Sequence, residues 1–264
     1  MKQFVQIVKQ MTTPQLWGKL EATTPLEPGI YVVATPIGNM LDMTLRGLFV
    51  LAKSKIIAAE KPATIKKLLS FYGIPVQNKI FKTLRTDTNK RNLAEIVSLA
   101  TRNPVSLVSE AGTVGISDPG RQVIFEAYKQ GIKINVVPGP SAVSAAISVD
   151  PFASNAGRFW FWGFMPKSSK KIRKVLRTVV PVAQDTVTSV VFFVSVHTLL
   201  KTLEVLCEFS KQLSDFKLRV SVFKELTKLH EAIFSDTACE IYNKFKNQNH
   251  LIKGEFVLII SVVQ

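Results

Sequence analysis

Three short loops with almost no side-chain bulk are the segments of this 264-residue chain best suited to hold a ligand. They read TPIGN (35–39), SEAGTVG (109–115) and PGPSA (138–142), and each follows an apolar run. Small residues let backbone N–H and C=O groups come close to a bound molecule. One such loop is equally typical of a tight turn between a strand and a helix, whereas three at corresponding positions favour a nucleotide-like ligand.

The spacing of the glycines argues against a phosphate-rich ligand. TPIGN does not match the G-x-G-x-x-G fingerprint, and no G-x-x-x-x-G-K-[ST] sequence occurs in the chain. The three histidines lack the H-E-x-x-H spacing, so we expect no metal site. Ser141 stands where a helix is expected to begin, and its hydroxyl is suited either to cap that helix or to bond a ligand.

The elements that would position these loops alternate as β/α units. Apolar runs rich in β-branched residues predict strands at 30–35, 55–59, 105–109 and 133–137. Segments with a helical period predict helices at 44–53, 62–72, 90–102, 118–130 and 141–148. Ligands of a parallel sheet bind beyond the carboxyl ends of its strands. The sequence therefore predicts a mostly parallel sheet with the three loops at its ligand-binding edge.

A second α/β domain is expected after the turn-rich segment SVDPFASNAGR. Its predicted strands are RFWFWGF (158–164), VTSVVFFV (187–194), LRVSVF (218–223) and EFVLIISVV (255–263), with helices at 197–213 and 236–246. The predicted domains are residues 29–149 and 150–264. Residues 1–28 would be an N-terminal extension, either loosely docked or folded as a short amphipathic helix.

The net charge of +15 favours a polyanionic partner, above all nucleic acid, although a basic proteome would explain it too. The run KSSKKIRKVLR (167–177) holds six cations and no acid, which is typical of an RNA-facing helix or of any solvated helix face. No apolar run is long enough to cross a bilayer, so a soluble protein is expected.

With only Cys207 and Cys239, a disulfide framework is not supported, and both cysteines lie in stretches with a helical pattern. The N-terminal segment also lacks an unbroken apolar run and a small-residue cleavage site, so it does not match a signal peptide. These features predict a reducing cytoplasm as the location.

Seven segments, in chain order, resemble the motifs of the tetrapyrrole methylase-like superfamily: GIYVVATPIGNMLDMTLRGLFVL, IIAAE, LVSEAGTVGISDPG, VVPGPSA, GFMPKSSKKIRK, KELTKLHE and KGEFVLII. The resemblance spans residues 29–262. It implies a homodimer of two-domain α/β subunits, with S-adenosylmethionine bound in the cleft between the domains. It also implies methyl transfer to the ribose 2′-hydroxyl of a cytidine in the decoding region of small-subunit ribosomal RNA.

The cofactor residues implied by this resemblance come from the same three loops. They are Pro36, Ile37 and Gly38, then Glu110, Ala111, Gly112, Thr113 and Ile116, and finally Ser141 and Ala142. Glu110 stands where the family usually has Asp, and Val114 where it usually has Pro. The central loop would be bare because the folded cofactor lies against it.

The substrate-side motifs depart from the family. AEKPAT (59–64) keeps Glu60 of the family's A-E-D-T-R-H but loses its Asp, Arg and His, and the family's H-N-E falls on Thr86, Asp87 and Thr88. FVSVHT keeps Ser195 and His197 of Y-E-S-P-H-R. The segment KELTKLHE (224–231) matches the family's motif at more positions than the other two segments do, because it keeps Glu225, Thr227, Lys228, His230 and Glu231. These losses indicate a changed substrate, a changed mechanism or lost activity.

Methyl transfer to a hydroxyl requires alignment of the two reactants and a group that accepts the proton. The candidates for this acceptor are Glu60, Glu225 and His230, each of which also has a purely structural interpretation. RFWFWGF would either stack RNA bases or fill a core. The candidate RNA-binding residues are Arg158, Lys167, Lys170, Lys171, Arg173 and Lys174.

Two other functions remain open from the sequence. The first is a methylase of the same fold that acts on a small molecule such as a tetrapyrrole, against which the basic helix argues. The second is a divergent RNA- or ribosome-binding protein without catalysis, which the altered substrate motifs favour and the retained cofactor loops disfavour.

Overall fold

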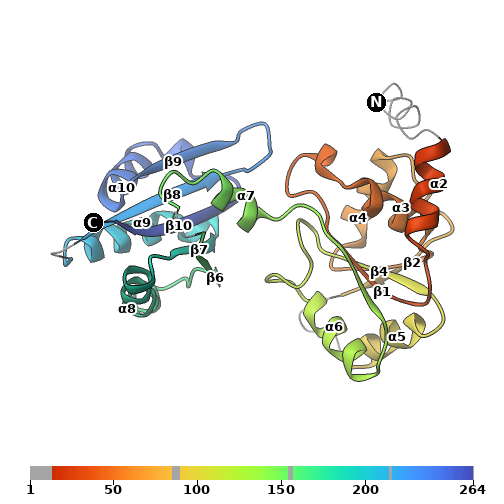
Figure 1. Ribbon diagram of the computed structural model, residues 1–264. Coiled ribbons are helices and arrows are strands. Elements are labelled where there is room, and N and C mark those ends of the chain that lie inside the picture. The colour runs from red at the N-terminus through yellow and green to blue at the C-terminus, as the bar shows by residue number, and fades with distance from the viewer. Residues whose placement is uncertain (1–13, 85–89, 154–156, 214–215, 264) are drawn as a thin grey trace. The chain divides into compact units, whose positions relative to one another are not determined.

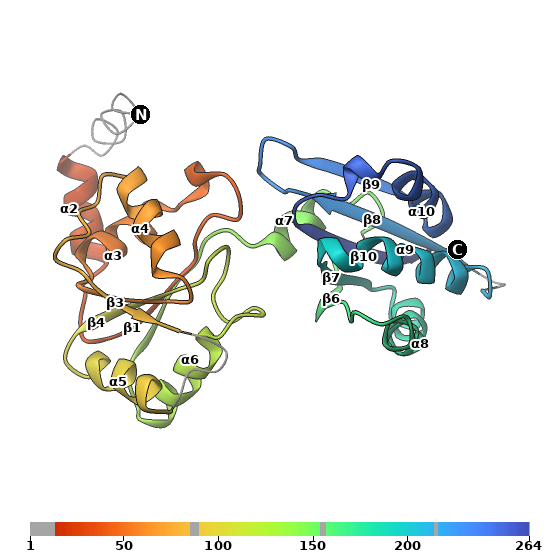
Figure 2. The same cartoon turned by 180° about the vertical axis from the view of Figure 1, so that it is seen from behind.

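The computed structural model describes residues 14–84, 90–153, 157–213 and 216–263. The chain divides into two units, each with its own five-stranded sheet (Figures 1 and 2). The first unit runs to Ser141 and the second begins at Ala142, ahead of the boundary expected near residue 150. The second unit thus includes helix α7 (Ala142–Ser148), whose Val143 and Ala146 belong to one of its apolar clusters.

The first unit contains a parallel sheet with the strand order β3-β2-β4-β1-β5. Its strands are β1 (Gly29–Val33), β2 (Ile56–Ala59), β3 (Ile80–Thr83), β4 (Pro104–Val108) and β5 (Ile134–Val137). Its helices are α2 (Pro14–Thr23), α3 (Leu45–Lys53), α4 (Pro62–Phe71), α5 (Lys90–Ala100) and α6 (Gly120–Lys129), with a short 3-10 turn η1 (Met40–Asp42). The expected parallel β/α arrangement is present here.

Two apolar clusters cover the faces of this sheet. One joins β1 and β2 to the apolar sides of α3 and α4, as Phe49 and Leu69 illustrate. The other joins β4 to α5 and α6 through Ile96 and Val123. Because both faces are buried, the central strands are apolar runs without alternation, which is why the sequence reveals them.

The strand register aligns the carboxyl ends of four neighbouring strands. Val33 pairs with Val108 and with Val137, and Ala59 pairs with Val108. The residues that follow these four positions therefore leave the sheet at one edge, where the three bare loops begin.

Part of the N-terminal segment packs against the first unit. Leu20 and Leu26 are half-buried against the cluster of α3 and α4. Tyr31 Oη donates a hydrogen bond to the carbonyl oxygen of Glu27 at 3.1 Å, and Glu27 forms an ion pair with Lys133 at 2.7 Å. Residues 1–13 lie outside the described part of the chain.

The second unit contains a mixed sheet with the order β6-β7-β10-β8-β9. Its strands are β6 (Phe159–Phe164), β7 (Ser189–Val194), β8 (Lys217–Lys224), β9 (Ala232–Thr237) and β10 (Phe256–Val263). Besides α7, its helices are α8 (Ser169–Thr186), α9 (Val196–Ser210) and α10 (Ala238–Asn247), with a 3-10 turn η2 (Asn249–Leu251).

The sheet of this second unit is mostly antiparallel, unlike the parallel sheet of the first unit. Only β6 and β7 run parallel, whereas β10 is antiparallel to both β7 and β8, and β8 is antiparallel to β9. The physical reason is the connection between strands. A short turn at 225–231 joins β8 directly to β9, and such a connection can only join antiparallel strands.

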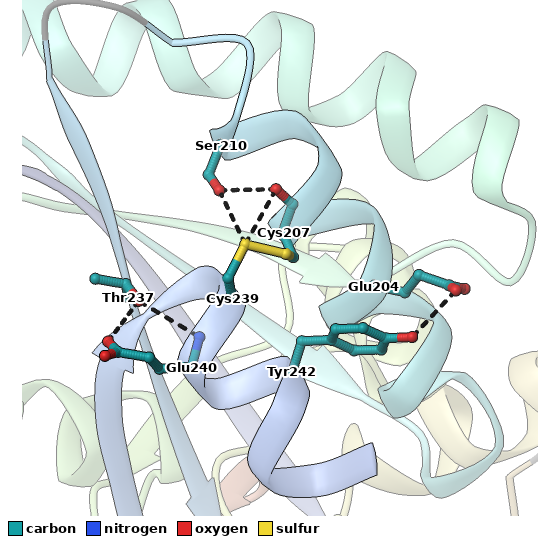
Figure 3. Close-up of a disulfide and its surroundings, with 7 residues drawn as sticks. All are labelled: Glu204, Cys207, Ser210, Thr237, Cys239, Glu240 and Tyr242. Carbon is teal, nitrogen blue, oxygen red and sulfur yellow. Dashed lines mark hydrogen bonds between the residues drawn. A yellow bond between two sulfur atoms is a disulfide. The ribbon is translucent and has the colours of Figure 1, made fainter.

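Cys207 and Cys239 form a disulfide, which corrects the expectation that the two cysteines do not support a disulfide framework (Figure 3). Both lie in helices as predicted, but the packing of α9 against α10 brings their Cα atoms to 4.4 Å, although they are 32 positions apart in the sequence. The same two helices are joined by Tyr242 Oη, which donates to Glu204 at 3.2 Å. Within the described ranges, no helix is long and apolar enough to cross a membrane.

Candidate active site

The loops after β1 and β4 are joined by a pair of backbone hydrogen bonds. Thr35 and Gly112 each donate an N–H to the other's carbonyl oxygen at 3.0 Å. Ser109 Oγ donates to the Gly112 carbonyl at 2.8 Å, which closes a tight turn in the β4 loop. These contacts form because β4 and β1 are neighbours in the sheet, so the two loops leave it side by side.

The loop after β5 is attached to the other two. Thr113 Oγ1 donates to the carbonyl oxygen of Pro140 at 3.1 Å. A Cβ atom at Gly139 would lie 3.1 Å from Ala34 Cβ, so only glycine fits that approach without displacement. The three loops predicted from the sequence therefore form one continuous surface at the carboxyl edge of the sheet.

Gly112 lies at the centre of the β4 loop and is buried. Its φ of +78° is strained for any residue with a side chain, and a Cβ there would lie 3.2 Å from Ile37 Cγ2. Pro36 and Ile37 are buried, while Ala111 and Ile116 reach solvent. A wall of small residues over a buried support fits the close approach of a ligand to the backbone, which is the arrangement that the resemblance implies for S-adenosylmethionine.

The remaining implied cofactor residues have different positions. Gly38 and Ser141 are half-buried in the loops after β1 and β5. Ala142 is the first residue of α7 and packs on the sheet of the second unit. Glu110 forms an ion pair with Lys61 at 2.7 Å, and the hydrogen bond from this pair raises the pKa of Lys61. The ion pair connects the β2 and β4 loops.

Asp118 holds the end of the β4 loop, a role that the sequence did not reveal. Both carboxylate oxygens accept the N–H of Gly115 at 2.9 Å, and Oδ1 also accepts the N–H of Gly120 at 2.8 Å. Between them, Ser117 has a φ of +65°, which is uncommon for a residue with a side chain. The sequence suggested Asp118 only as a helix start, and α6 in fact begins two residues later.

A hollow of about 680 Å³ lies beside this turn, in the first unit. It is lined by Glu60, Gly115, Ser117, Asp118, Pro119, Arg121, Gln122 and Phe125. Glu60 follows the last residue of β2 and is half-buried. No hydrogen bond or ion pair to its carboxylate is made by any residue that the structure describes. Glu60 is therefore the candidate acid or base that lies beside the cofactor loops.

Glu225, by contrast, is engaged in the turn between β8 and β9. Its carboxylate accepts hydrogen bonds from Lys228 Nζ at 2.9 Å and from the N–H of Glu255 at 2.8 Å. Burial acts to raise the pKa of Glu225, but these two bonds and the charges of Lys228 and Lys224 outweigh it and lower the pKa. His230 is exposed in the same turn. The Oε1 atom of Glu225 is thus engaged in two hydrogen bonds within this turn.

The other predicted substrate residues are dispersed. Ser195 Oγ lies 2.9 Å from Thr198 Oγ1 at the start of α9, and His197 is exposed on that helix. Thr86, Asp87 and Thr88 lie outside the described residues. In RFWFWGF, Trp160 and Trp162 pack against the core of the second unit.

The basic helix α8 is amphipathic. Ile172, Val175 and Leu176 are buried against the sheet. The exposed cations are Lys167, Lys170, Lys171 and Lys174, and Arg158 is exposed before β6. Arg173 forms an ion pair with Glu208 and is therefore less available to a partner.

The architecture of this chain, a unit with a parallel sheet and bare loops at its carboxyl edge followed by a unit with a mixed sheet, also occurs in solved structures. The solved structure of the methyltransferase CobJ superposes on this chain with a TM-score of 0.61 over 88% of this chain and 93% of that chain. The sequence identity is 16%, so the likeness concerns the fold alone.

The model of the family "Tetrapyrrole (Corrin/Porphyrin) Methylases" matches residues 29–242, and the chain belongs to this family. Its relatives include the Ribosomal RNA small subunit methyltransferase I of Neisseria meningitidis serogroup A, which is 36% identical over 89% of this chain and 76% of the relative. The protein of that name from Borrelia garinii is 33% identical over 88% of this chain and 98% of the relative. The expected family and fold are confirmed, and with them a methyltransferase whose methyl donor is S-adenosylmethionine.

Proposed function

We propose that this protein methylates the ribose 2′-hydroxyl of a cytidine in the decoding region of small-subunit ribosomal RNA. The observation that carries the proposal is the name shared by relatives that match about nine-tenths of this chain at 36% and 33% identity. The net charge of +15 supports an RNA substrate, because each neutralised phosphate releases counterions. We also propose a homodimer in the cytoplasm, where small ribosomal subunits are present.

The residues of the three loops would hold the cofactor. When bound, S-adenosylmethionine supplies an electrophilic methyl group on a sulfonium that needs no protonation to leave. The backbone of Ala111, Gly112 and Thr113 and the side chains of Pro36 and Ile37 would form the surface beneath it. The hydrogen bonds from Thr35 to Gly112 and from Thr113 to Pro140 preorganise that surface, so little ordering is needed on binding.

Glu60 is the residue that we propose as acceptor of the ribose proton. Its carboxylate lies at the hollow beside the cofactor loops and accepts no hydrogen bond from a described residue. Glu225 is held by Lys228 and Glu255, so freeing it would cost two hydrogen bonds. The exposed His230 remains the second candidate. General base catalysis contributes about 10²- to 10⁴-fold to a rate.

The test measures transfer of labelled methyl groups to small ribosomal subunits that lack the native modification. We expect transfer by the wild type, a loss of about 10²-fold or more in kcat for Glu60→Gln, and an unchanged affinity for S-adenosylmethionine. Glu225→Gln is the matched carboxylate control and should reduce kcat far less.

The other two functions predict different outcomes of this test. A small-molecule methylase would bind the cofactor and label a tetrapyrrole but not the subunits. A non-catalytic ribosome-binding protein would bind the subunits and label neither. Either result would contradict the proposed function.

A further inference from the structure

The outer face of helix α6 has a composition that solvent exposure alone does not explain. Its outward positions are Arg121, Gln122, Phe125, Tyr128 and Lys129, while Val123 and Ala127 point into the core. The side chain of Phe125 is 60% exposed and that of Tyr128 is 78% exposed. Two adjacent exposed rings between two cations are unusual for a helix that only covers a sheet, because large aromatic side chains are normally buried.

This face continues into the hollow described above. Arg121, Gln122 and Phe125 line the hollow, and Glu60 forms part of its wall. The volume of about 680 Å³ is within the range of small-ligand sites, so the hollow has room for a nucleoside. One ring of the α6 face is thus placed at a cavity that also contains the proposed proton acceptor.

The charges and rings of this face match single-stranded RNA. Proteins bind unpaired bases by stacking them on aromatic side chains and hold the backbone with Arg and Lys. Lys129 Nζ lies 4.7 Å from the ring centroid of Phe125, so one cation sits directly beside the ring. None of the five outward residues is acidic. Acidic side chains lie nearby: Glu126 on the same helix accepts a hydrogen bond from Gln130 Nε2 at 2.9 Å, and Glu60 and Asp118 line the hollow. The cations Arg121 and Lys129 are therefore the part of this face that suits the phosphates of a strand.

We propose that the outer face of α6 binds a single-stranded segment of the RNA substrate, with one base stacked on Phe125 and with Arg121 and Lys129 at the flanking phosphates. This inference rests on the proposed function, because it places the RNA beside Glu60. It differs from the sequence-based expectation, which assigned RNA binding to Arg158, Lys167 and the cations of α8.

The test uses the full-length protein and small ribosomal subunits that lack the native modification, with binding measured at several salt concentrations. Phe125→Leu keeps an apolar side chain but removes the ring, and we expect roughly 5- to 100-fold weaker binding. Phe125→Tyr keeps the ring and should bind like the wild type. Arg121→Ala should weaken binding and lower the salt slope by about one unit.

Arg102→Ala is the matched control. This exposed arginine precedes β4 and so lies at the amino end of the strand, opposite the cofactor loops. Its replacement should leave binding and the salt slope unchanged. All four variants should bind S-adenosylmethionine like the wild type, which excludes misfolding as the cause of any loss.

The outcomes separate this inference from the proposed function. If the wild type methylates the subunits and Phe125→Leu binds them as tightly as the wild type does, the inference alone is overturned. If the wild type neither binds nor methylates the subunits, both the inference and the proposed function are overturned.

Sedimentation velocity tests the alternative that the outer face of α6 binds a second copy of this chain. If Phe125→Leu dissociates a dimer while RNA binding is unchanged, the face is a subunit interface and the inference is wrong.

Discussion

Replacing Asp118 by Ala should destabilise the turn that connects the cofactor loop to α6. The carboxylate accepts the N–H groups of Gly115 and Gly120, and a hydrogen bond to a charged acceptor contributes about 1.5–3 kcal/mol. Both bonds are partly exposed, so water replaces part of each when the carboxylate is removed. Gly120 begins α6, where a negative charge adds about 0.3–1 kcal/mol through the helix dipole. We therefore expect a loss of about 2–4 kcal/mol in the free energy of unfolding for Asp118→Ala.

Equilibrium unfolding in urea gives this free energy, and hydrogen exchange of residues 115–125 places the change at the turn. Asp118→Asn is the matched control, since its single amide oxygen still accepts from Gly120 but carries no charge. Its stability should fall between those of the wild type and Asp118→Ala. A loss below about 1 kcal/mol for Asp118→Ala, or an equal loss for both variants, would refute the assignment of this turn to the Asp118 carboxylate.

Three further predictions concern stability. Ser117→Gly should raise the free energy of unfolding by about 1 kcal/mol in the same urea experiment, because the φ of +65° at this position strains serine and not glycine. Reduction of the disulfide, or the double change Cys207→Ser and Cys239→Ser, should cost about 3–4 kcal/mol, since the bridge closes a loop between residues 32 positions apart. An unchanged urea midpoint in dithiothreitol would contradict this. Burial raises the pKa of Asp150 above 3.8 despite opposing hydrogen bonds, so the folded protein holds this proton to higher pH than the unfolded chain. The stability that Asp150 contributes is therefore lost as the pH rises from 3.8 through the raised pKa. Asp150→Asn carries no charge at any pH, so it should be more stable than the wild type only at pH values above this range. Thermal unfolding of both proteins across the pH range measures this difference.

The first sheet and its loops were predictable because their signals are local. Strands buried on both faces read as apolar runs, and loops that touch a ligand through their backbone lose side-chain bulk. The sequence did not reveal β3 or β9. Both are strands at a sheet edge that are largely half-exposed, and β3 has only four residues, so neither has a continuous apolar pattern.

The features that could not be predicted from the sequence depend on contacts between segments that are distant in the chain. The direction of β10 follows from its insertion between β7 and β8, which no local pattern encodes. The disulfide requires the packing of α9 on α10.

The candidate site was predictable in its loops but not in the roles of its acids. Glu60 and Glu225 are both carboxylates that match the family's motifs, and only their surroundings in the fold distinguish them. The φ of +51° at Glu225 and the glycine at 254, where a Cβ would lie 2.4 Å from Glu225 Cδ, show a carboxylate built into a turn. The carboxylate of Asp118 accepts a hydrogen bond from the N–H of Gly115, three residues before it. The sequence of this segment resembles an ordinary helix start and gives no sign of that bond.

The most direct test of the central claim is the chemical position of the transferred methyl group on the RNA. After reaction with labelled S-adenosylmethionine, the ribosomal RNA is hydrolysed in alkali, which cleaves every linkage next to a free ribose 2′-hydroxyl. We predict label in a single alkali-resistant dinucleotide from the decoding region, with the methyl group on the ribose of a cytidine. Label on a base, or no label from protein that binds the cofactor, would contradict the account.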